Sequence, residues 1–182
     1  MLDRIGLIGY GNIGKRHAEI IEQRAILDFV CDLKEVNIEE VPYFSDYKEA
    51  IKSKYCDIVA ICTPNHTHFR IAYDCLKAGK DVIIEKPMTL SHSSAKILAE
   101  VAQALGRQIY VVKQNRYTAP VQWLKSILSD IGELYMIDVN CYWNRNKSYY
   151  DQSKWRASRH ESGGLVFTQF SHFIDTDNPI VL

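Results

Sequence analysis

Three glycines stand at a spacing that suits the binding of a phosphate group. Gly9, Gly11 and Gly14 form the stretch G-Y-G-N-I-G, between an apolar run and a stretch of helical periodicity. In this context the first glycine permits a tight turn, the second lets the backbone approach a pyrophosphate, and the third allows close packing of helix against strand. The start of the following helix offers unpaired N–H groups and a positive dipole. The motif therefore predicts a dinucleotide site, with an ordinary glycine turn as the alternative.

An acidic residue follows where the ribose of such a dinucleotide is expected. Asp32 ends the second apolar run. A carboxylate there accepts hydrogen bonds from ribose hydroxyls and repels a 2′-phosphate, so NAD is expected in preference to NADP. Lys34 argues for NADP, because a cation two residues further on can accommodate the phosphate. The alternative for Asp32 is a solvated strand end.

Two further side chains are of types suited to proton transfer. Lys86 lies in Glu85-Lys86-Pro87, directly after an apolar run. A lysine in a cleft, beside the cationic nicotinamide ring of the expected dinucleotide, loses proton affinity. It can then donate a proton to a reacting oxygen. His172 has a pKa range suited to removing a hydroxyl proton, and Asp175 lies one helical turn further on, where it can orient the imidazole. A solvated loop lysine and a core histidine are the alternatives.

The hydrophobic pattern predicts the elements that position these residues. Short runs rich in Ile and Val alternate with stretches of helical spacing, which is typical of a parallel sheet covered by helices on both faces. The expected strands cover residues 4–8, 26–31, 57–62, 81–84 and 108–112, and the expected helices cover residues 13–24, 46–53, 66–78, 91–105 and 118–129. Thr63, Pro64 and Asn65, like Lys86, then follow the carboxyl ends of strands, where open α/β sheets bind ligands.

The pattern changes after Gly132, which indicates a second domain. Residues 133–142 alternate like a strand with one wet face, and irregular aromatic sequence follows. A lone strand with one helix cannot make a sheet domain. The expected fold class is therefore a doubly wound parallel sheet followed by an incomplete α+β substrate domain, with a dinucleotide-binding domain over residues 1–130 and a partial substrate and dimerisation domain over residues 131–182. Because an uncovered strand edge promotes association, we expect a homo-oligomer through the second segment.

Composition excludes several classes of function. Of the 182 residues, 47% are hydrophobic and 24% charged, and the 22 Lys and Arg balance the 22 Asp and Glu, so no charge excess directs the protein to nucleic acid or to an acidic membrane. No Cys or carboxylate accompanies His66 and His68 at a ligand spacing, so no metal site is expected. The odd number of cysteines without a C-x-x-C pair indicates core thiols in a reducing compartment, the cytoplasm. They are Cys31, Cys56, Cys62, Cys75 and Cys141.

Several motifs together resemble one family. G-Y-G-N-I-G-K-R-H-A is followed by T-P-N-H-T-H at residues 63–68, E-K-P at 85–87, K-W-R at 154–156 and T-Q-F-S-H-F-I-D at 168–175. This combination resembles the Gfo/Idh/MocA family of NAD(P)-dependent sugar oxidoreductases. The resemblance runs from residue 2 to about residue 175 but covers about the first half of a family member, so we expect the chain to end within the C-terminal domain.

The resemblance implies hydride transfer between a nicotinamide cofactor and a hydroxyl carbon of a sugar or nucleotide sugar, with Lys86 and His172 as catalytic residues. Many members carry an aspartate four residues before this histidine, and Thr168 stands there in this chain. The implied cofactor-binding residues are Gly9, Gly11, Asn12, Ile13, Gly14, Asp32, Thr63, Pro64, Asn65, His68, Glu85 and Lys86. The implied substrate-binding residues are Asn115, Arg116, Tyr117, Trp155, Arg156, Thr168 and His172.

Two other functions remain open at this point. Some proteins of this fold bind the dinucleotide and sense it without catalysis, although the presence of both Lys86 and His172 argues against such a role. The chain as it stands is also consistent with an inactive fragment. The motif at residues 168–175 is similar to that of members that oxidise nucleotide-linked amino sugars, which implies a substrate of that kind.

Overall fold

The computed structural model describes residues 2–140 and 142–175. The chain divides into two compact units, Met1–Val112 and Lys113–Leu182. The boundary at residue 130 that the sequence suggested for the two domains stays a prediction.

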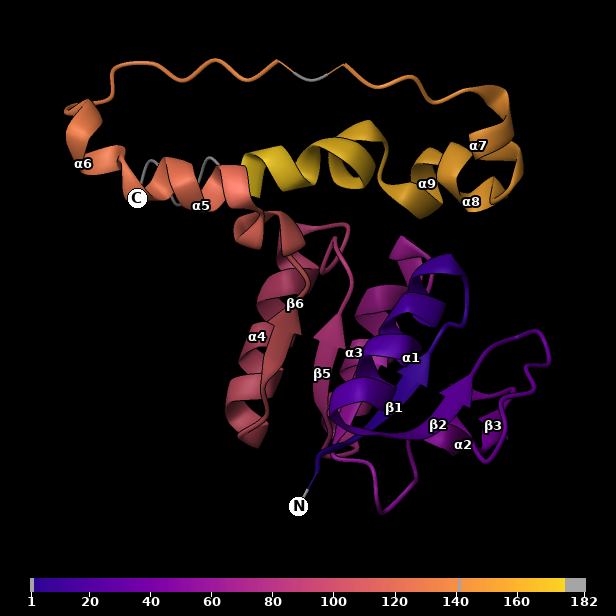
Figure 1. Cartoon of the computed structure of the whole chain (residues 1–182). Helices are drawn as coiled ribbons and strands as arrows, with labels where there is room; N and C mark the ends of the chain where they lie inside the picture. Colours follow the sequence, from indigo (N-terminus) through magenta and orange to yellow (C-terminus); the bar gives the residue numbers. More distant parts are fainter. Residues whose placement is uncertain (1, 141, 176–182) are drawn as a thin grey trace. The chain divides into compact units, whose positions relative to one another are not determined.

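The first unit is built on one sheet of six parallel strands (Figure 1). They are β1 (Arg4–Ile8), β2 (Ile26–Cys31), β3 (Tyr43–Phe44), β4 (Ile58–Ile61), β5 (Asp81–Ile84) and β6 (Ile109–Val111). Their order in the sheet is β3-β2-β1-β4-β5-β6, which confirms the doubly wound fold class. The sequence pattern missed β3, because its two residues are too few to show a period.

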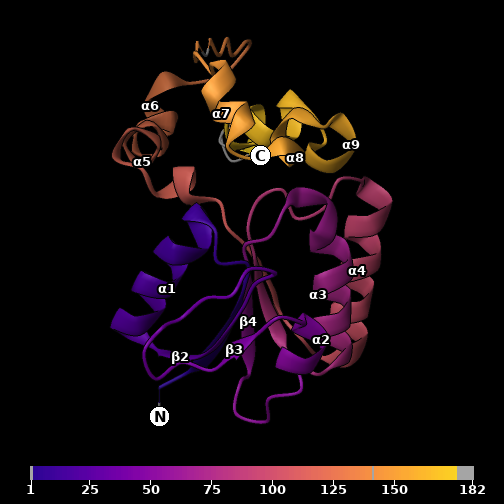
Figure 2. The ribbon, with the colours of Figure 1, turned by 90° about the vertical axis from the view of Figure 1, so that its right-hand side faces the viewer.

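Helices cover both faces of this sheet, with α1 (Asn12–Arg24) on one face and α2 (Tyr47–Ala50), α3 (His68–Lys77) and α4 (His92–Leu105) on the other (Figure 2). A separate cluster of buried side chains fills each interface, one around Leu7 and Ile21 and one around Phe29, Ile61 and Leu76. The helix ends follow local chemistry. The Ser91 hydroxyl accepts the Ser94 amide at the start of α4, and the left-handed Gly106 ends the same helix.

The strand order places three loops at one edge of the sheet. Because β1 is flanked by β2 on one side and β4 on the other, the order reverses at β1, and open α/β sheets bind ligands at the carboxyl ends of the strands around such a point. The glycine loop follows β1, Thr63 and Pro64 follow β4, and Lys86 follows β5. These parallel strands therefore carry the predicted cofactor residues of this unit to the same edge.

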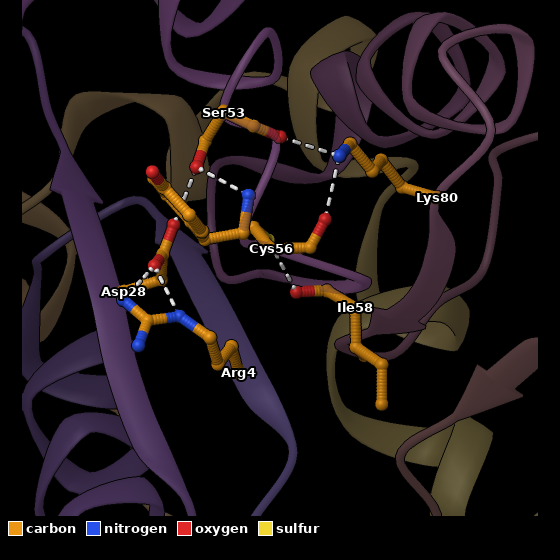
Figure 3. Close-up of polar contacts among 7 residues, drawn as sticks. Arg4, Asp28, Ser53, Cys56, Ile58 and Lys80 are labelled. Atoms are coloured by element: carbon orange, nitrogen blue, oxygen red, sulfur yellow. Dashed lines mark hydrogen bonds and ion pairs between the residues drawn. The ribbon is translucent and has the colours of Figure 1, made fainter.

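A polar network secures the opposite edge, near the amino ends of the strands (Figure 3). The Arg4 guanidinium donates to the Asp28 carboxylate, which also accepts the Ser53 hydroxyl at 2.7 Å. The Lys80 ammonium donates to the carbonyl oxygens of Ser53, at 2.6 Å, and Cys56, at 2.5 Å. Because Asp28 is only 8% exposed and Lys80 only 9%, these bonds replace the water that the charges lost on folding.

We therefore expect Lys80→Met to lower the free energy of unfolding by about 1–3 kcal/mol, the usual cost of leaving buried polar groups without their partner. Chemical denaturation measures the change. Lys77→Met is the matched control, because Lys77 is exposed at the end of α3 and no such loss is expected there. Equal midpoints for the two variants would contradict the stabilising role of the Lys80 contacts.

The second unit is helical over most of its described residues. It contains η2 (Gln114–Tyr117), α5 (Ala119–Ser126), α6 (Leu128–Ile131), α7 (Lys147–Asp151), α8 (Lys154–Ala157), α9 (Arg159–Ser162) and the π-helix η3 (Val166–Phe170). An α-helical stretch continues η3 to residue 175. The single helix expected over residues 118–129 is instead divided at Ile127 into α5 and α6.

The strand expected over residues 133–142 is not formed across the described residues 133–140. A strand exists through its pairing with another strand, and none of the described strands pairs with this segment. Its apolar side chains stay exposed, among them Met136 at 83% and Tyr135 at 88%. The alternating pattern is present in the sequence, but here it accompanies an exposed segment without strand pairing. Within the described parts of the chain, no helix combines the length and apolar character needed to cross a membrane.

Candidate active site

The glycine loop has the geometry of a phosphate cradle. Gly9 adopts a φ of +94°, and a Cβ there would lie 2.7 Å from the carbonyl carbon of Cys62. A Cβ on Gly14 would lie 1.9 Å from the carbonyl oxygen of Gly9. Around Gly11 the situation is opposite, since a Cβ would meet no atom within 4 Å. Two of the glycines thus allow the loop to close on itself, while Gly11 leaves open space beside the first turn of α1, where Asn12 and Ile13 begin the helix.

Asp32 connects the end of β2 to this loop. One oxygen of its carboxylate accepts the backbone amide of Tyr10 at 2.7 Å, and the other accepts the amide of Lys34 at 2.9 Å. The carboxylate is therefore fixed beside the glycine loop and retains lone pairs for further donors. This geometry suits the ribose contact that we predicted for Asp32, although Lys34 contributes only its amide here.

From this geometry we expect NAD(H) to bind at least about tenfold more tightly than NADP(H), a difference of about 1.4 kcal/mol. Calorimetric titration of the chain with both cofactors measures it. Asp32→Asn removes the charge that repels a 2′-phosphate and should reduce the ratio of NAD(H) affinity to NADP(H) affinity. Lys34→Ala should leave this ratio unchanged. An equal preference in the unaltered chain, or a loss of NADP(H) binding in Lys34→Ala, would assign cofactor choice to Lys34.

The loop after β4 is held by its own hydrogen bonds. The Thr67 hydroxyl lies 2.6 Å from the Thr63 hydroxyl and 2.7 Å from the Pro64 carbonyl oxygen. Asn65 begins the 3₁₀ turn η1 (Asn65–Thr67) and is 5% exposed. The backbone of this loop lies so close to Gly9 that a Cβ on Gly9 would meet the Cys62 carbonyl group and the Thr63 nitrogen.

His68 lies deeper than the sequence suggested. Its ring is fully buried, Nδ1 lies 2.7 Å from the Pro87 carbonyl oxygen, and Nε2 lies 2.8 Å from the Thr63 carbonyl oxygen. Burial lowers the pKa of His68, against the opposing effect of these two hydrogen bonds. Both ring nitrogens thus face main-chain carbonyl oxygens of the protein, and the cofactor contact expected of His68 stays a prediction.

Lys86 follows β5, in a segment with a cis peptide bond between Lys86 and Pro87. The Lys86 amide donates to Glu85 Oε2 at 3.1 Å, and Glu85 Oε1 lies 2.9 Å from His17 Nε2. Burial by itself raises the pKa of Glu85, but the hydrogen bond and charge of His17, with the amide and charge of Lys86, hold this pKa below its usual value. Glu85 is therefore a carboxylate that joins helix α1 to the segment carrying Lys86.

Sequence reasoning missed His17, although a signal was present. The residue stands one helical turn after Gly14, on the helix that starts at the glycine loop. A histidine at that position faces the strand ends when the helix packs on the sheet, but the identity of its partner depends on a contact between residues far apart in the chain.

The predicted residues of the second unit have their own partners. Nε2 of His172 lies 3.4 Å from Nε2 of Gln114, and the residue is 7% exposed. Asp175, which the helical spacing suggested as the partner of His172, instead accepts a bidentate pair of hydrogen bonds from Arg116, both at 2.7 Å. Lys113 Nζ lies 3.5 Å from the same carboxylate.

This ion pair takes the place of the expected contact between His172 and Asp175, and burial explains it. Asp175 is 8% exposed, so its charge requires a cation, and the fork of a guanidinium matches a carboxylate better than a single imidazole N–H does. Burial raises the pKa of Asp175, but Arg116 and Lys113 more than offset it and hold the pKa below its usual value. The Arg116 guanidinium, predicted to bind substrate, is here engaged by Asp175.

The remaining predicted substrate residues lie on short elements of the same unit. Tyr117 is 80% exposed at the end of η2, beside Asn115. Trp155 and Arg156 lie on α8, where the Arg156 guanidinium stacks 4.8 Å from the centre of the Tyr149 ring. The Thr168 hydroxyl donates to the Gly164 carbonyl, just before η3, at 3.0 Å.

Four of the cysteines lie among the described residues, in or beside the core of the first unit. Burial raises the pKa of the Cys31 and Cys56 thiols to about 11 and raises those of Cys62 and Cys75 further, so these are inert core thiols. Cys141 lies outside the described residues. No group of three His, Cys, Asp or Glu side chains suited to a metal occurs in residues 2–140 and 142–175.

The sheet order, the glycine loop at the point where it reverses and the acidic residue ending β2 together define a dinucleotide-binding Rossmann domain. The chain belongs to the Gfo/Idh/MocA oxidoreductase family. Residues 4–113 match the family's NAD-binding Rossmann fold, and residues 125–178 match its C-terminal alpha/beta domain. The resemblance seen in the motifs is confirmed, and NAD is the cofactor of this fold.

Individual relatives are of modest identity and about twice the length. The chain is 29% identical over 187 residues to the uncharacterized oxidoreductase YdgJ of Escherichia coli, covering 94% of this chain and 51% of that protein. It is 25% identical over 182 residues to the NADP(+)-dependent scyllo-inositol 2-dehydrogenase IolW of Bacillus subtilis, covering 94% and 50%. The crystal structure of the WlbA dehydrogenase from Bordetella pertussis, in complex with NADH and UDP-GlcNAcA, is 31% identical with a TM-score of 0.90, covering 99% of this chain and 55% of that one. The chain thus spans about half the length of the relatives it matches.

Proposed function

We propose that this chain is the cofactor-binding half of an NAD-dependent dehydrogenase that transfers a hydride between the nicotinamide and a hydroxyl-bearing carbon of a sugar or nucleotide sugar. The observation that carries the proposal is Lys86 at the carboxyl end of β5, joined through Glu85 and His17 to the helix that starts at the glycine loop. The open space beside Gly11 fits a pyrophosphate at the same edge of the sheet.

In the proposed reaction the substrate loses a proton from its hydroxyl group and a hydride from the same carbon, which becomes a carbonyl. The bound nicotinamide supplies the hydride acceptor. His172 takes the hydroxyl proton, and the Lys86 ammonium stabilises the negative charge that develops on the oxygen. Thr168 cannot act as a carboxylate, so Lys86 and His172 carry the proton transfer between them.

The substrate class is supported by the relatives. One acts on scyllo-inositol and another was crystallised with UDP-GlcNAcA, and both of these molecules present ring carbons with hydroxyl groups. The motif at residues 168–175 and the higher identity to the WlbA dehydrogenase favour a nucleotide sugar. Arg156 and Asn115 are the side chains proposed to contact it, with Trp155 and Tyr117 beside them.

The test is an assay of NAD reduction by the complete protein with a panel of UDP-sugars, free sugars and inositols. Turnover with at least one nucleotide sugar is the expected result. Tight NAD binding without turnover on any member of the panel would instead favour a dinucleotide sensor.

We also propose that residues beyond 132 mediate association. The exposed apolar side chains of Leu134, Met136 and Ile137 support this, because contiguous exposed apolar surface marks an interaction site. The measurement is the mass of the protein in solution, compared with that of a Met136→Lys variant.

A further inference from the structure

The main chain on both sides of Lys86 is held by a histidine. On the amino side, Glu85 accepts the Lys86 amide at 3.1 Å and contacts His17 at 2.9 Å. On the carboxyl side, the Pro87 carbonyl oxygen lies 2.7 Å from Nδ1 of His68. Pro87 is itself buried, so its carbonyl depends on this internal partner.

The His68 ring also reaches the neighbouring loop. Its Nε2 lies 2.8 Å from the Thr63 carbonyl oxygen, so a single ring spans the segment after β4 and the segment after β5. His68 is the first residue of α3, whose inner face is anchored in the core by Ile71 and Ala72. The ring therefore extends from the first turn of α3 and lies between the Thr63 and Pro87 carbonyl oxygens.

We propose that His68 is a positioning residue for Lys86, because it sets the location of the lysine backbone relative to Thr63 and to the glycine loop. This inference rests on the proposed role of Lys86 in proton transfer. Glu85 and His17 restrain the chain before Lys86, and His68 restrains it after, so the backbone of the lysine is fixed from both directions.

The effect acts through distance and not through charge. A neutral imidazole carries one N–H and donates to one carbonyl, and a protonated ring donates to both. Burial lowers the pKa of His68 and thereby favours the neutral ring, while Glu85 nearby opposes this and His66 supports it. The contact that restrains the segment after Lys86 needs only a proton on Nδ1, which the neutral Nδ1–H ring and the protonated ring both provide. An error of about 1 Å in the position of a reacting group can cost about 10²-fold in rate.

The experiment compares His68→Phe, which keeps a ring but removes both nitrogens, with His68→Gln, which keeps a polar group that can reach one carbonyl. His66→Gln is the control, because His66 is exposed two residues away. In the 182-residue chain, lysines are reductively methylated with ¹³C-formaldehyde, and the Lys86 signal is assigned by its loss in Lys86→Arg. We expect His68→Phe to shift the Lys86 resonance, His68→Gln to shift it less, and His66→Gln to leave it in place.

In the complete protein the same variants are assayed for turnover. We expect kcat to fall by about 10²-fold in His68→Phe and by less in His68→Gln, with the KM for NAD largely unchanged. If both variants lower the unfolding temperature but leave the Lys86 resonance and kcat as they were, His68 is purely structural and the proposal is overturned. Should His68→Phe fail to fold, His68→Gln decides by the same measurements. The resonance is read without substrate, so failure of the proposed reaction leaves this test valid.

Discussion

Turnover of the complete protein is expected to fall by about 10²–10⁴-fold when Lys86 is replaced by alanine, the usual contribution of a positioned proton-transfer group. The affinity for NAD should stay close to its original value, because the phosphate cradle and Asp32 belong to other loops. Steady-state kinetics give the first quantity and calorimetric titration gives the second. The loss should therefore be seen in kcat with little change in cofactor binding.

Two further variants make this result specific. Lys77→Ala removes an exposed lysine at the end of α3 and should retain full turnover. Lys86→Arg keeps the positive charge but cannot donate a proton to the substrate, since a guanidinium does not lose its proton in proteins. A Lys86→Ala enzyme as fast as the original would show that Lys86 takes no part in the reaction, and the role assigned to Glu85, His17 and His68 around it would lose its purpose.

The sheet could be predicted from sequence because its central strands are mainly buried. Short, mainly apolar runs such as residues 26–31 and 81–84, each with a single aspartate, are typical of strands in a parallel sheet, and the observed β2 and β5 have these bounds. The two-residue β3 lacks any such run and joins the sheet by pairing with Val30 and Cys31 of β2. The segment at residues 133–140 shows the reverse case, in which the alternation is present but a pairing partner is absent among the described strands.

The candidate site was predictable only where short motifs carry it. The spacing of the glycines and Asp32 along one βαβ unit predicts their shared site, and the structure brings them together. His17 with Glu85, and Arg116 with Asp175, are contacts between residues far apart in the chain, for which spacing carries no information. The expected His172–Asp175 pair shows how a local rule fails, because a buried carboxylate found a better partner in a distant guanidinium.

Alanine substitutions at Gly11 and Gly14 should separate cofactor binding from folding. Gly14→Ala places a methyl group 1.9 Å from the Gly9 carbonyl oxygen, so the loop or the helix must shift. We expect the free energy of unfolding to fall by about 1–3 kcal/mol or more, the range for overpacking a close contact. Gly11→Ala meets no protein atom within 4 Å and lies at a φ of −75°, which alanine adopts readily, so the unfolding temperature should not change.

The same methyl group on Gly11 should nevertheless weaken NAD binding by about tenfold or more, or about 1.4 kcal/mol, because it fills space that a pyrophosphate would need in order to approach the backbone. Thermal unfolding and calorimetric titration of the 182-residue chain measure both quantities on the same sample. Gly79→Ala is no suitable control, since Gly79 has a φ of +77° and strain alone would destabilise it. Ala25→Gly is the control, because Ala25 follows α1 and lies outside the glycine loop, so this change leaves the phosphate cradle untouched. If Gly11→Ala binds NAD as tightly as the original chain, the open space beside Gly11 is not the phosphate site, and the pyrophosphate must be placed elsewhere along the strand ends.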